Sequence, residues 1–145
     1  MTGHLDEASL RAVEFIHAIV WAEHTVLWDL LSDAGRETAL SVAVRNGLDR
    51  VAASRIRDDL ADPAEREHLF RQLVEGLRRD LRSVELTELA VGECNLACGG
   101  TVAAELLSPS SLPGTDAWPA GRLILSQDPQ RGWLVDRLEP SLAGP

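Results

Sequence analysis

Two histidines and two tryptophans recur at helical spacing near the N-terminus, at His17, Trp21, His24 and Trp28. On one continuous helix they would share a stripe beside the apolar stripe, because a helix turns once in about 3.6 residues. Imidazole transfers protons near neutral pH, and indole offers a large apolar surface with one N–H donor. The stripe therefore predicts a pocket wall, with packing against the core as the alternative. A break near residues 22–23 would rotate the two halves apart and remove the stripe.

A carboxylate stands among leucines near the C-terminus. Alternation in a strand over 133–138 puts Asp136 on a leucine-rich face, which we expect the helices to cover. The residues expected on that face are Leu123, Leu125, Gln127, Leu134 and Leu138. An isolated charge there is costly, so the carboxyl must be neutral, hydrogen-bonded or paired. Asp136 is thus a candidate general acid or base, and the alternatives are pairing to an arginine, capping of a helix, or contact with water near the rim of the sheet.

Together these groups predict one pocket. Asp136 is its predicted catalytic group and His24 the partner of Asp136. The predicted ligand-binding residues are His17, Trp21, Trp28, Leu125 and Leu134. If Asp136 carries a reaction, Asp136→Asn should abolish activity and leave the fold intact.

The composition removes several kinds of chemistry. All 14 basic residues are arginine and tyrosine is absent, so neither a Schiff-base lysine nor a phenol donor is available. Cys94 and Cys98 have no histidine nearby, and two thiols do not complete a zinc site, so no metal and no cofactor are predicted. No glycine-rich phosphate loop follows a predicted strand.

The charge and hydropathy of the chain bear on its partners and location. A net charge of -9 disfavours nucleic acid as a partner. No apolar run reaches the roughly 18–20 residues that span a bilayer, so no membrane contact is predicted. The polar start MTGHLDEASL is unlike a secretory signal, which predicts a cytoplasmic protein.

The order of the predicted elements is helices first and strands second. Residues 6–84 carry helical periodicity, with a capping box at Asp62-Pro63-Ala64-Glu65 and a helix end at Asn46-Gly47. Residues 86–139 alternate as two antiparallel hairpins. We therefore predict a single α+β domain over 1–145, in which helices pack on a curved antiparallel sheet. The segment 47–61 is either a lid or additional core.

Arginines gather late in the helix that follows Pro63, at Arg78, Arg79 and Arg82. We interpret them as partners of the helix dipole and of nearby acids, with a binding patch as the alternative. Two pairs are spaced for ion pairing at i,i+4, namely Glu67/Arg71 and Glu75/Arg79.

Two segments, EFIHAIVWAEHTVLWDLLSDAGRE and GRLILSQDPQRGWLVDRL, resemble the NTF2-like superfamily. The resemblance implies an α+β cone in which a curved antiparallel sheet wraps around a helix and leaves a cavity. Members usually insert strands where residues 39–83 here read as helical, which implies a helix-enlarged variant. Ketosteroid isomerase-like members use an aspartate with a tyrosine, which this chain lacks. Limonene epoxide hydrolase-like members use an Asp–Arg–Asp set, for which Asp136 and either Arg122 or Arg137 are candidates.

Three functional hypotheses follow. The first is a protein that binds an apolar small molecule and acts on it, if at all, by acid–base chemistry. The second is an interaction module that forms a homodimer through the sheet face bearing Ile124, Trp133 and Val135. The third is a filled core in which Asp136 is structural and the tryptophans pack.

Overall fold

The computed structural model describes residues 3–81, 89–108 and 118–140. The helices are α1 (Gly3–Val20), α2 (His24–Leu30), α3 (Asp33–Arg45), α4 (Arg50–Arg57) and α5 (Pro63–Asp80). The strands are β1 (Ala90–Leu96), β2 (Val102–Ser108), β3 (Trp118–Asp128) and β4 (Gly132–Pro140). The predicted α+β class is confirmed, with the helices in the N-terminal part and the sheet in the C-terminal part.

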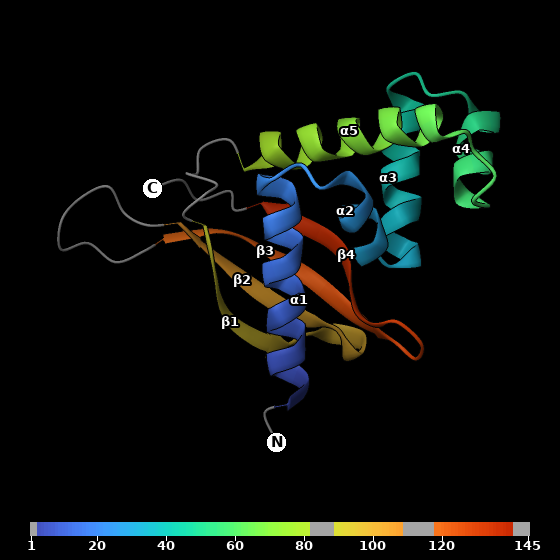
Figure 1. Cartoon of the computed structure of the whole chain (residues 1–145). Helices are drawn as coiled ribbons and strands as arrows, with labels where there is room; N and C mark the ends of the chain where they lie inside the picture. Colours follow the sequence, from blue (N-terminus) through green and yellow to red (C-terminus); the bar gives the residue numbers. More distant parts are fainter. Residues whose placement is uncertain (1–2, 82–88, 109–117, 141–145) are drawn as a thin grey trace.

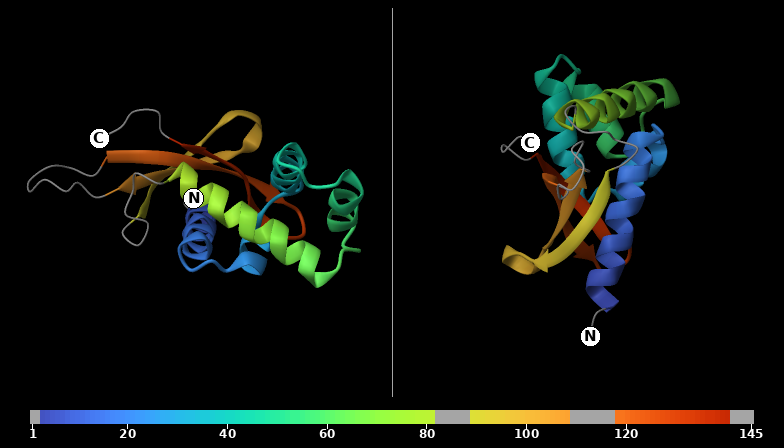
Figure 2. Two further views of the ribbon diagram at one scale, coloured as in Figure 1. Left: turned by 90° about the horizontal axis from the view of Figure 1, so that it is seen from above. Right: turned by 90° about the vertical axis from the view of Figure 1, so that its left-hand side faces the viewer.

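The four strands form one open antiparallel sheet in the order β1-β2-β3-β4. Helix α1 crosses one face of this sheet and contacts β1, β2 and β4, while α3 packs beside β4 (Figure 1). Helix α5 lies over α1 and α2 on the same side as the other helices, and α4 joins α3 to α5 (Figure 2). Among the described residues, no helix is both long enough and apolar enough to cross a membrane.

The helix-covered face of the sheet differs from the predicted one on β4. Leu123 and Leu125 are fully buried in the core, as predicted. Their neighbours in the core are Trp133 and Val135, however, and not Leu134 and Asp136. The core residues contributed by the sheet are Val102, Ala104, Leu106, Ala120, Leu123, Leu125, Trp133 and Val135.

The length of the connection in the last hairpin causes this change of face. Asp128 pairs with Gly132, so the connection is three residues long and Leu125 stands opposite Val135. The register then shifts, because Ile124 pairs with Arg137 and leaves Asp136 as the additional residue of a β-bulge. Beyond the bulge the predicted face is restored, so Leu138 stands opposite Leu123 and packs against the core. A one-residue shift exchanges the two faces of a strand.

The N-terminal helix is interrupted where the histidine and tryptophan stripe was expected to continue. Helix α1 ends at Val20, Ala22 adopts a φ of 53°, and α2 begins at His24. The Arg78 guanidinium donates to the carbonyls of Ile19 (3.0 Å) and Val20 (2.7 Å), which satisfies the end of α1. The continuous stripe is therefore absent, for the reason that a break in the helix separates its halves.

The local predictions at the other helix ends are confirmed in part. α3 ends before Gly47, whose φ of 109° suits glycine. Asp62 is the N-cap of α5 and Pro63 its first residue, but the Asp62 side chain makes no capping hydrogen bond. The Glu65 carboxylate instead pairs with Arg55 of α4 at 3.0 Å, so the predicted capping box is wrong.

Candidate functional site

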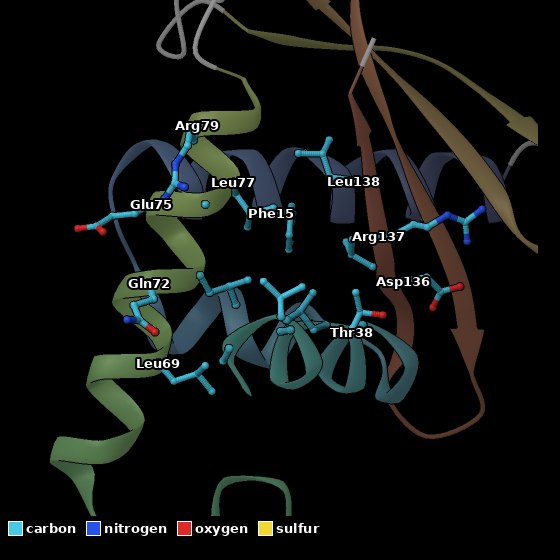
Figure 3. A pocket seen from close by; sticks show the side chains of 18 of the residues that line it. Phe15, Thr38, Leu69, Gln72, Glu75, Leu77, Arg79, Asp136, Arg137 and Leu138 are labelled. Atoms are coloured by element: carbon cyan, nitrogen blue, oxygen red, sulfur yellow. The ribbon is translucent and has the colours of Figure 1, made fainter. Parts of the chain in front are cut away.

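A half-open groove with a volume of about 660 Å³ lies between α3, α5 and β4 (Figure 3). Its floor is formed by Phe15 of α1 and by Leu31, both of which are buried. The strand β4 closes one side with residues 135–138. The groove is therefore bounded by three elements and open on the remaining side.

The wall on α3 consists of small side chains. The wall residues, spaced as one helix face, are Gly35, Thr38, Ala39, Val42, Ala43 and Asn46. Gly35 makes the close approach of α3 to β4 possible, since a Cβ there would lie 2.6 Å from the carbonyl oxygen of Val135. α3 is thus held tightly against β4 at its N-terminus, and its small side chains leave space beside α5.

The wall on α5 is mainly apolar. It presents Leu69, Leu73, Gly76 and Leu77 to the groove. A Cβ added at Gly76 would meet no other atom within 4 Å, so the glycine adds to the open space. Leucines and a glycine on one side, with alanines and a valine on the other, form a surface suited to apolar atoms.

Polar groups occupy the rim. Thr38 donates its hydroxyl to the carbonyl of Ala34 at 3.0 Å. Arg137 donates to Glu139 at 2.7 Å, and its side chain points to the far side of β4 (Figure 3). Arg122 donates to the same carboxylate at 2.6 Å, and these two arginines lower the pKa of Glu139. Arg137 therefore serves an ion-pair network outside the groove.

Arg79 differs from Arg137, because it lines the groove without an ion pair or hydrogen bond among the described residues. The predicted pair Glu67/Arg71 is present at 2.8 Å. The predicted pair Glu75/Arg79 is absent, and Figure 3 shows the Glu75 carboxylate directed outward from α5. Arg79 thus keeps its charge available at the rim.

The Asp136 carboxylate is held by two hydroxyl groups of the same chain. Its Oδ1 accepts hydrogen bonds from the hydroxyls of Ser32 (2.5 Å) and Ser126 (2.7 Å). Ser32 is the N-cap of α3, and its hydroxyl oxygen accepts from the Gly35 amide at 3.1 Å. The Ser32 amide donates to the Val135 carbonyl at 2.9 Å. Asp136 therefore ties the start of α3 to the bulge of β4 through Ser32, and among the described residues it neither pairs with an arginine nor caps the helix itself.

Asp136, the additional residue of the bulge in β4, lies between the groove and a second hollow. It contributes to the lining of the groove and also of a smaller hollow, about 270 Å³, beside Ser126 and Leu134. Its carboxylate points away from the groove (Figure 3). An acid–base group for the groove would need the opposite orientation.

The predicted aromatic and histidine residues are not brought together with Asp136. The exposed His17 ring contacts Glu23 through Nδ1 at 2.8 Å, and Trp21 is 65 % exposed beside it. His24 is half-buried at the start of α2 and lines neither hollow. His24 and Asp136, the predicted partners, therefore do not line a common hollow.

Trp28 follows the packing alternative. It is buried and stacks on Phe70 of α5, with ring centroids 5.0 Å apart. The Arg36 guanidinium lies over the Trp28 ring, 5.2 Å from the ring centroid. Burial, together with the nearby Arg131, lowers the pKa of Arg36. These contacts join α2, α3 and α5 and leave Trp28 outside the groove.

The remaining predicted residues lie in the sheet. Leu125 is in the core, and Leu134 lines the smaller hollow. The expected dimer face is changed as well, since Ile124, Trp133 and Val135 are all buried within the single chain. Trp133 and Val135 are covered by the helices, so they are not available to a second copy.

Metal-binding groups do not gather in the described part of the chain, where no cluster of three or more His, Cys, Asp or Glu side chains is found. Burial raises the pKa of the Cys94 thiol, against the opposing effect of a hydrogen bond with Ser9. A raised pKa lowers the fraction of Cys94 that is present as thiolate, the reactive form, at neutral pH.

Comparison with protein-family models, with curated proteins and with solved structures gives no match.

Proposed function

We propose that the protein binds an apolar small molecule in the groove between α3, α5 and β4. The groove volume of about 660 Å³ supports this proposal most directly, because small-molecule sites typically measure about 300–1,000 Å³. Its apolar floor and walls, with polar groups only at the rim, have the composition of such sites.

The exposure of the wall residues gives binding a driving force. Leu73, Leu77 and Leu138 are only partly buried, and Val42 is 45 % exposed. A ligand in the groove would remove these side chains from water, and each Å² of apolar area buried stabilises a complex by about 25 cal/mol before the costs of binding. The exposed apolar atoms therefore favour an apolar occupant.

The surroundings of Asp136 favour binding without acid–base chemistry. Its carboxylate already accepts two hydroxyl groups and points away from the groove. The two observations place the Asp136 carboxylate away from an occupant of the groove. The NTF2-like architecture remains part of the proposal, supported by helices that cover one face of an antiparallel sheet and by a hollow beside it.

The test uses Nile red, a neutral apolar dye whose fluorescence rises in an apolar site, with Gly76→Phe as the obstructing variant. Position 76 has open space in front of it, so phenylalanine enters the groove without displacing the core. We expect at least a tenfold loss of dye affinity, while the melting temperature is maintained. The matched control is His68→Phe, which adds the same ring at an exposed position of α5 outside the groove. Unchanged dye binding by a folded Gly76→Phe protein would refute the proposal.

A further inference from the structure

We infer that the natural ligand is an anionic amphiphile, an alkyl chain ending in a carboxylate, whose charged end is bound by Arg79. This inference rests on the proposed function, because it assigns a ligand class to the same groove. The apolar walls define the part of the ligand that is buried, and the free charge at the rim defines its end group.

The charges around the groove select the sign of that end group. The charged residues that line it are Glu75, Arg79, Asp136 and Arg137. Asp136 is held by two serines and Arg137 by Glu139, and both side chains point to the far side of β4. The Glu75 carboxylate is directed outward into solvent. Arg79 is consequently the charged group still available to a ligand in the groove.

Two other arginines of α5 have partners, unlike Arg79. Arg78 is bound to the carbonyl groups at the end of α1, and Arg71 is paired with Glu67. Among the described residues Arg79 has no such partner. Guanidinium binds carboxylate through two parallel N–H donors, so a carboxylate is the end group that fits it best.

The position of Arg79 sets the direction of the ligand. Figure 3 shows Arg79 at one end of the α5 wall and Leu69 at the other, with Leu77 between them. A carboxylate at Arg79 would leave the alkyl chain against Leu77, Leu73 and Leu69. The side-chain amides of Asn46 and Gln72 also line the groove and have no hydrogen-bond partner among the described residues, so they add N–H donors along the rim.

The experiment compares decanoate with 1-decanol as competitors of Nile red at neutral pH, since the two share one chain and differ in end-group charge. A protein of net charge -9 repels an anion through its overall field, so a preference for decanoate must arise locally. We expect decanoate to bind roughly three- to fivefold more tightly than decanol, the magnitude of a solvent-exposed ion pair. Arg79→Gln should remove this preference, whereas Arg79→Lys should retain part of it, because the charge remains but the two parallel donors are lost. Arg50→Gln, which removes the same charge from α4 outside the groove, should leave the preference unchanged.

The outcomes separate the inference from the proposed function. Equal displacement of Nile red by decanoate and decanol overturns the anionic ligand and leaves the apolar groove in place. A decanoate preference that survives in Arg79→Gln overturns the role of Arg79. Absence of binding by Nile red and by both competitors overturns the proposed function and the inference with it.

Discussion

Two glycines that line the groove should respond in opposite directions to the same substitution. Alanine normally stabilises a helix by about 0.5–1 kcal/mol relative to glycine. At Gly76 the added Cβ enters open space, so Gly76→Ala should gain that amount. At Gly35 the Cβ would lie 2.6 Å from the Val135 carbonyl oxygen and 3.1 Å from that of Asp136. Both obstacles are backbone atoms, which cannot move aside as a flexible side chain can.

The cost at Gly35 follows from the displacement required. To restore an ordinary contact of 3.4 Å from 2.6 Å, α3 must move away from β4 by roughly 0.8 Å. That movement lengthens the 2.9 Å bond from the Ser32 amide to Val135 and strains the contact of Ser32 with Asp136. Overpacking of this kind costs about 1–3 kcal/mol, so the net loss expected for Gly35→Ala is about 1–2 kcal/mol.

Thermal and urea unfolding measure both variants. For a chain of this length, the expected loss lowers the melting temperature by about 3–6 °C. Gly76→Ala should instead raise it slightly. Equal stabilisation by the two substitutions would show that α3 does not approach β4 as closely as described, and the wall of the groove would then be wrong.

Further perturbations test the anchoring of α3 and the ion pairs of the sheet. Ser32→Ala should lower the free energy of unfolding by about 1–2 kcal/mol, because it removes the cap of α3 and one partner of Asp136. The control Ser41→Ala, on the exposed part of α3, should be nearly neutral. Equal effects of the two substitutions in urea unfolding would contradict this role of Ser32. Arginine partners hold the pKa of Glu139 below its ordinary value of 4.5, so its stabilising contribution is present above that pH and is lost as the pH falls through the lower, folded-state value. The stability difference between the wild-type protein and Glu139→Gln should therefore shrink below about pH 4.5, and a difference that grows in acid would refute this.

The architecture was predictable from the sequence because it depends on periodicity. Helical spacing in the first part and alternation in the second are local patterns, and both appear in the structure. Pro63 and Gly47 mark helix ends because their backbone preferences act within a few residues. The face of β4 was not predictable, since the length of the turn and the position of the bulge depend on how two strands and a helix fit together.

The candidate site was predicted only in part. Asp136 was identified as a residue that needs partners, and it has them in Ser32 and Ser126. The predicted stripe that included His24 is interrupted at Ala22, where a residue in the left-handed conformation breaks the helix. The sequence has no glycine at this position to indicate such a break. The spacing of Gly35, Ala39 and Ala43 was visible in the sequence. That spacing indicates a groove wall only once α5 is known to lie opposite, because the groove is formed by two helices that are separated in the chain by α4.

Methyl-resolved NMR of the protein titrated with 1-decanol locates the bound molecule and so shows whether the groove is the binding site. We expect shifts of the methyl groups of Ala39, Val42 and Leu73, which line the groove. The methyl groups of Leu10 and Val13, exposed on α1 outside the groove, should stay unchanged. Shifts confined to α1, or no shifts at saturating ligand, would contradict the assignment of the groove as the binding site.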